Sequence, residues 1–220
     1  MVQKLRVVYE YVHEITFLLR ECQLVNFRKT TRDQTREETH MTGSSTTEII
    51  AVALNRAFSE LDACFALPRE KLESRPDRLD AWNIAQHLEH VCLANHFLLL
   101  TIQKGCRTAR RRAAATPIPE AESDLELLAP IASPGAFDWP PPSHMLPTGR
   151  APLSELRARL DGQRELCLRL LGGLLRGEGR LCRIYMSVNG LGKLDMYQWL
   201  YFLAQHIRFH LTLISRRLAA

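Results

Sequence analysis

Two histidines lie four residues apart in a strongly apolar segment near the C-terminus, at His206 and His210. A helix places residues with this spacing on one face, so both imidazoles point the same way. At about 100° per residue, that face also carries Trp199, Phe202, Leu203 and Leu213, and the opposite face carries Ala204, Gln205, Arg208, Thr212 and Ser215. Burying an imidazole without a partner costs free energy. The pair therefore predicts a shared metal ion.

A third ligand is expected from another helix. The segment Trp82–His90 carries two further histidines, His87 and His90, which lie one helical turn apart and toward a common side with Asn83. The spacing does not choose between the two histidines. Three protein ligands leave a coordination position open, as in catalytic zinc sites, and imidazole also suits nickel, iron and copper. The alternative is a set of core histidines that are hydrogen-bonded and bind no metal.

Apolar periodicity predicts the helices that would hold these residues. They run from about Thr47 to Leu67, from a cap at Asp80 to Lys104 with an end at Gly105, from Ser154 to about Gly172, and from a cap near Asp195 to about Leu218. Together with almost no strand signal, this pattern predicts an all-α four-helix bundle in residues 43–220. Residues 1–42 are expected to add an extra N-terminal helix outside the core.

A proline-rich stretch separates the second helix from the third. Nine of the eleven prolines fall between Pro117 and Pro152, which predicts a long crossover loop over about residues 105–152. We expect that residues 116–152 could lie over the site as a lid. The basic run Arg107–Arg112 reads as solvated loop, because no aromatic residues interleave with it to stack on bases. We therefore expect no nucleic-acid partner.

Composition favours a globular protein without a membrane partner. The hydrophobic content is 46% and the net charge is only +5. The six cysteines form no C-x-x-C pair, which is typical of reduced thiols in a cytoplasmic protein. Charged residues interrupt the first segment, so it predicts neither a signal peptide nor a membrane span.

The histidine-bearing segments resemble the DinB-like superfamily of metal-binding four-helix bundles, of DinB/YfiT-like type. The resemblance covers about Thr46 to Leu218 and rests on Trp82–His90, Gly192–Asp195 and the His206-x-x-x-His210 pair. It implies that His90, eight residues after the tryptophan, is the first metal ligand and that His206 and His210 are the other two. Asn83 stands directly after Trp82, where the family pattern usually has a serine or threonine. His87 has no fixed place in the pattern and becomes an alternative ligand or a residue that orients one.

The resemblance also implies the chemistry. Characterised relatives include metal-dependent transferases and isomerases that use low-molecular-weight thiols such as bacillithiol, mycothiol or glutathione. A divalent ion, zinc or nickel, would lower the pKa of the thiol and direct its attack on an electrophile. A hydrolase that uses metal-activated water is the near variant.

Other readings of the chain stay open at this point. Glu89 falls about 100° from His90 on a helix, so no general base can be placed, while Arg107 or Arg110 could meet the carboxylates of a thiol. The alternative function is a non-enzymatic, stress-related binding or oligomerisation module. An enzyme would leave a cavity at the metal, which a module would fill with side chains. In either case the apolar N-terminal helix favours a homodimer.

Overall fold

The computed structural model describes residues 45–75, 81–136 and 140–219, and here the protein is all-α apart from one small hairpin. The long helices are α2 (Thr46–Cys64), α4 (Ile84–Ala113), α5 (Leu153–Gly172) and α6 (Met196–Ala219). The short elements are α3 (Arg69–Glu73), the 3₁₀ turns η1 (Glu126–Ala132), η2 (Ser143–Met145), η3 (Glu178–Leu181) and η4 (Val188–Gly190), and the strands β1 (Arg183–Met186) and β2 (Gly192–Asp195). The expected N-terminal helix lies outside the described residues.

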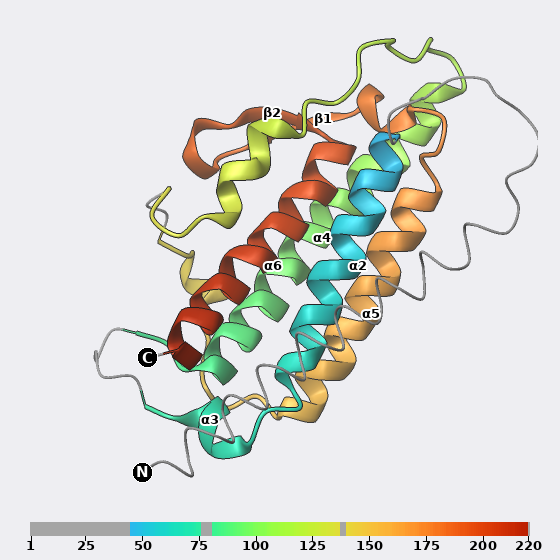
Figure 1. Ribbon diagram of the computed structural model, residues 1–220. Coiled ribbons are helices and arrows are strands. Elements are labelled where there is room, and N and C mark those ends of the chain that lie inside the picture. Colours follow the sequence, from blue (N-terminus) through green and yellow to red (C-terminus); the bar gives the residue numbers. More distant parts are fainter. Residues whose placement is uncertain (1–44, 76–80, 137–139, 220) are drawn as a thin grey trace, which may run out of the picture. The chain divides into compact units, whose positions relative to one another are not determined.

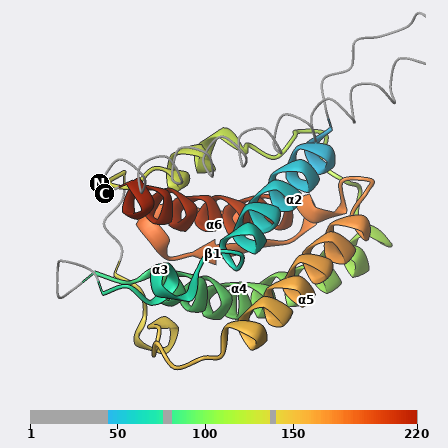
Figure 2. The same ribbon diagram turned by 60° about the horizontal axis from the view of Figure 1, so that its bottom comes forward.

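The long helices form the expected four-helix bundle. Helix α6 packs beside α2 and α4, and α5 packs beside the same two helices on the other side (Figures 1 and 2). Apolar residues at helical spacing fill the space between them. Core positions with essentially no exposed surface include Ile50, Leu54, Leu88, Val91, Ile102, Cys167, Leu200, Leu203 and Ile207. Burial of each such large side chain contributes about 1.5–3 kcal/mol, so the core accounts for the architecture.

Polar side chains cap three of the four long helices at their N-termini, and α5 starts after Pro152 without a side-chain cap. Ser45 and Glu48 form a reciprocal capping box at α2, and Asn83 and Gln86 form another at α4. At α6 the Asp195 carboxylate accepts hydrogen bonds from the backbone N–H groups of Tyr197 and Gln198, both at 3.0 Å. The cap of α4 corrects the sequence prediction, which began this helix at Asp80.

Helix α4 is longer than its sequence suggests. It does not end at Gly105 but continues to Ala113, so Arg107–Arg112 is helical and not a loop. Three arginines occupy the last turn, where positive charge interacts favourably with the helix dipole. Gly105 serves close packing instead of termination, since a Cβ there would lie 2.0 Å from Met196 Sδ.

The crossover segment, residues 114–152, covers part of the bundle. Its 3₁₀ turn η1 packs on α6, and Leu128 and Ile131 are fully buried. Ala204 and Gln205 are also buried, although the helical projection placed them opposite the histidines, so α6 is covered on that face too. Further along the segment, η2 contacts α4 near its N-terminal end.

A short antiparallel hairpin leads into α6. Strands β1 and β2 pair from Arg183 opposite Asp195 to Met186 opposite Gly192. The indole Nε1–H of Trp199 donates to the Ile184 carbonyl at 3.3 Å, which ties the hairpin to α6. In the part of the chain that the structure describes, no helix has the length and apolar character needed to cross a membrane.

The close approach at Gly105 generates a stability prediction. Gly105→Ala forces a methyl group against the buried Met196 side chain, so we expect the free energy of unfolding to fall by about 1–3 kcal/mol in urea titrations. Gly162→Ala in α5 is the matched control. Its added Cβ meets no atom within 4 Å, so this variant should be more stable by up to about 1 kcal/mol. Equal stabilisation of both variants would contradict the packing role of Gly105.

Candidate metal centre

Two neighbouring helices bring the four site histidines together. Helices α4 and α6 are antiparallel, so His87 meets His210 while His90, one turn further along α4, meets both His206 and His210. The ring centroids of His90 lie 5.3 Å from His206 and 4.6 Å from His210. The site therefore depends on the register in which α4 and α6 pack.

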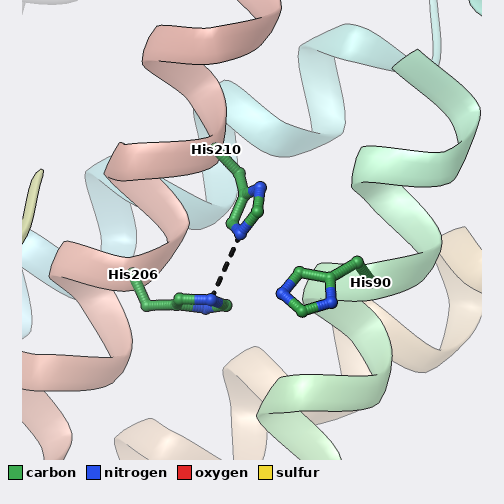
Figure 3. A group of neighbouring side chains, drawn as sticks. All are labelled: His90, His206 and His210. Atoms are coloured by element: carbon green, nitrogen blue, oxygen red, sulfur yellow. Dashed lines mark hydrogen bonds between the residues drawn. The ribbon is translucent and has the colours of Figure 1, made fainter. Parts of the chain in front are cut away.

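His90, His206 and His210 form a cluster that could hold a metal ion. Each offers one ring nitrogen, and these atoms all lie within 4.8 Å of one another (Figure 3). The side chains are buried, with 4%, 6% and 3% of their surface exposed. Within the described residues, this is the group of metal-ligating side chains that the geometry brings together.

The spacing of the nitrogens fits a tetrahedral ion. Nε2 of His206 and Nε2 of His210 are 3.2 Å apart. Two nitrogens bound at 2.0–2.1 Å to a tetrahedral zinc ion would lie about 3.3 Å apart, so these two rings need little movement to become ligands. His90 has to approach somewhat more closely than it does here. The donor set is chemically suited to zinc, nickel and related divalent ions.

The tautomer of His90 is set by the crossover segment. Nδ1 of His90 lies 2.8 Å from the backbone carbonyl oxygen of Met145. A carbonyl only accepts hydrogen bonds, so Nδ1 must carry the proton. Nε2 is then left with its lone pair, which is the form a metal ligand requires.

His87 lies behind His210. Nδ1 of His87 is 3.1 Å from Nδ1 of His210, on the far side of the His210 ring from His206. When His210 Nδ1 donates its proton to His87, His210 Nε2 is free to bind a metal. In this position His87 can orient the His210 ring. It is not a member of the cluster of three, which contains His90.

Trp82 packs against three of the four histidines. Its ring centroid is 4.8 Å from His90, 5.5 Å from His87 and 6.2 Å from His210, and it stacks on His210 with an interplanar angle of 15°. Asn83, the next residue, is the N-cap of α4, so the helix begins one turn before His87. Trp82 therefore contributes to the site by packing against the histidines, and Asn83 contributes by capping α4.

Burial keeps the histidines neutral. Desolvation lowers the pKa of His206 to about 3 and that of His87 to about 4; the neighbouring His90 adds to both effects, and Arg217 adds to the second. The pKa values of His90 and His210 are lowered for the same main reason. Neutral imidazole is the form that binds metals, so no proton needs to leave these rings at neutral pH.

Sequence reasoning missed one part of the site. The carbonyl of Met145 and the Glu89 side chain join the crossover segment to α4: the Thr148 hydroxyl and the Gly149 N–H each donate to the Glu89 carboxylate at 2.7 Å. A backbone carbonyl in a proline-rich loop leaves no residue-type signal. Residues 145–149 lie against the helix turn that carries His90, and the expectation of a lid stays a prediction.

The arginines proposed for a thiol carboxylate are too far away. Arg107 and Arg110 lie 17 and 20 residues beyond His90 in α4. At a rise of 1.5 Å per residue, that is about 25–30 Å along the helix. Arg110 instead lies beside Gly173, where its Nη1 would be 3.4 Å from an added Cβ.

The described cysteines are not activated nucleophiles. Cys64, Cys92, Cys106, Cys167 and Cys182 are all buried and free of disulfides. Desolvation raises the pKa of Cys64 to about 11 and those of Cys106 and Cys167 to about 12. Burial therefore keeps these five thiols in the protonated, poorly nucleophilic form.

Fold and site together define a helical bundle with a buried three-histidine cluster on facing helices. The family model of the DinB superfamily matches residues 53–214, and the chain belongs to that superfamily. The matched region contains all three clustered histidines. Searches of curated proteins and of solved structures gave no match.

The lowered histidine pKa values predict how the stability of the metal-free protein depends on pH. An unfolded histidine titrates near pH 6.5, whereas His206 and His87 in the fold titrate near 3 and 4. Between about pH 6.5 and 4 the unfolded chain binds protons that the folded chain does not. As the pH is lowered through this range, the free energy of unfolding should therefore decrease by up to about 1.4 kcal/mol per pH unit for each histidine.

Urea unfolding of chelator-treated protein at pH 7, 6 and 5 measures this effect. His206→Gln removes one such group and should give a shallower decrease. His96→Gln, at an exposed position of α4, is the matched control because it removes no buried imidazole. Identical slopes for wild type and His206→Gln would contradict the buried neutral imidazole.

Proposed function

We propose that this protein binds a divalent metal ion through His90, His206 and His210 and uses it with a low-molecular-weight thiol in a transfer reaction. The observation that carries the proposal is the convergence of three buried imidazoles whose nitrogens lie within 4.8 Å. Membership of the DinB superfamily supports it, because the family resemblance implies the same three ligands. A related metal-dependent hydrolase is the near variant.

Zinc or nickel is the proposed ion. Three neutral imidazoles leave the charge of a divalent ion uncompensated and a coordination position open, which favours an anionic fourth ligand. A bound ion of this kind lowers the pKa of a thiol and stabilises the thiolate. The described cysteines are buried, and burial raises the pKa of the Cys106 and Cys167 thiols. This supports an external thiol as the ligand that becomes the thiolate.

The chain's own residues would prepare the site for this chemistry. Met145 holds the proton of His90 on Nδ1, and His87 can do the same for His210. Trp82 packs against the rings of His90 and His210. A dry, preorganised donor set strengthens electrostatic interactions with an incoming anion. The partners proposed are therefore a small thiol and a small electrophile.

Metal content tests the ligand set. Untagged protein reconstituted with zinc or nickel should hold close to one ion per chain by elemental analysis. His90→Ala, His206→Ala and His210→Ala should each lose most of it, since a site with two ligands binds far more weakly. His96→Ala, an exposed histidine of the same helix, should retain the wild-type content. Metal that survives in all three ligand variants would contradict this site.

Thiol binding tests the proposed chemistry separately. In protein loaded with Co²⁺, addition of bacillithiol, mycothiol or glutathione should produce a sulfur-to-cobalt charge-transfer band. The S-methylated thiol should not, because it cannot form a thiolate. A thiol that produces the band should then be consumed with a model electrophile faster by wild type than by His206→Ala. Metal binding without any thiol response would leave a metal-binding module and contradict the transferase.

A further inference from the structure

The loop that contacts His90 is fastened by the residue next to it. Glu89 and His90 are consecutive in α4, and both are bonded to the same short stretch, residues 143–149. Nδ1 of His90 donates a hydrogen bond to the Met145 carbonyl. The Glu89 carboxylate accepts hydrogen bonds from the Thr148 hydroxyl and the Gly149 N–H. We call this group of contacts from Glu89 to Thr148 and Gly149 the Glu89 clasp.

The Glu89 clasp has the features of a strong anchor. Glu89 is only 5% exposed, and each of its carboxylate oxygens accepts one hydrogen bond of 2.7 Å. Hydrogen bonds to a carboxylate are about twice as strong as neutral ones. The Thr148 hydroxyl also accepts the Arg150 N–H at 3.1 Å, which directs its proton to Glu89.

The loop conformation is built around the same contact. Gly149 has a φ of +70°, a left-handed conformation that favours glycine, and its backbone runs beside Gln86, the N-cap partner of α4. A second contact joins this loop to α4, between the rings of His144 and Phe97, whose centroids are 4.4 Å apart. Met145 lies between these two anchors, so the position of its carbonyl depends on both.

We propose that Glu89 is a positioning residue for the metal site. By fastening residues 143–149 to α4, the Glu89 clasp keeps the Met145 carbonyl on Nδ1 of His90 and so keeps Nε2 turned toward His206 and His210. The inference rests on the proposed metal-binding function. It assigns Glu89 to ligand orientation and not to proton transfer with a substrate.

A purely structural anchor would behave differently. It would contribute to stability, but the His90 tautomer and the metal affinity would not change when the loop is released. The two roles are therefore separated by measuring the loop, the imidazole and the metal in the same variants. Glu89→Gln preserves the shape of the side chain but presents an amide N–H₂ to one of the two donors. Thr148→Val removes the hydroxyl donor of the clasp with little change in volume and leaves the Gly149 N–H as the remaining donor.

The test compares these variants with Glu165→Gln, an exposed glutamate of α5 that pairs weakly with Arg169 at 3.4 Å. In Glu89→Gln and Thr148→Val, the Gly149 amide should exchange with deuterium faster than in wild type. Zinc affinity, measured by competition with a chromophoric chelator, should be weaker by about tenfold, as for the loss of an outer hydrogen-bond partner of a metal ligand. Glu165→Gln should match wild type in both measurements.

The ¹⁵N shifts of His90 in metal-free protein give a readout that needs no metal. Wild type should show a protonated Nδ1, and the clasp variants should show a mixture of tautomers. Faster Gly149 exchange with an unchanged tautomer and zinc affinity within twofold of wild type would overturn the proposal. If wild type bound no metal, the proposed function would fail, and the tautomer alone would decide the role of Glu89. If Glu89→Gln did not fold, Thr148→Val would carry the test.

Discussion

Several neutral imidazoles are buried between α4 and α6, and the packing of both helices has to accommodate them. His206 and His210 are nearly fully buried, and His87 and His90 face them from α4. Desolvation of the charged form keeps them neutral. In a buried neutral imidazole, each ring nitrogen needs a hydrogen-bond partner or a metal ion. Nδ1 of His90 contacts the Met145 carbonyl, Nδ1 of His210 contacts His87, and the Nε2 atoms of His206 and His210 face each other at a position that fits an ion.

The bundle serves that arrangement through packing and capping. Asn83 starts α4 one turn before His87, and Asp195 starts α6 so that its histidines lie level with those of α4. At the other end, Gly105 lets α4 approach Met196 closely. The crossover segment then closes over both helices, with η1 on α6 and residues 143–149 on α4. Elements distant in sequence thereby converge on one cluster.

Local sequence signals predicted much of this and failed where remote contacts decide. The spacing of His206 and His210 predicted a shared face, and Asp195 predicted the start of α6, because both are properties of a single helix. Gly105 was wrongly taken as a helix end, since its reason is a side chain on α6. Gln205 was placed outside because η1 had no periodic signal. His90 and His87 are one turn apart, so their spacing left both open; the family resemblance pointed to His90, and the packing of α4 on α6 places His90 in the cluster.

The central claim is that the Nε2 atoms of His90, His206 and His210 bind one divalent ion. Side-chain ¹⁵N NMR of histidine-labelled protein during a zinc titration tests it most directly. If these residues are the ligands, their Nε2 resonances shift together until one zinc per chain is bound, while Nδ1 of His90 stays protonated. Unchanged imidazole resonances, or a set in which His87 binds zinc in place of His90, would contradict it.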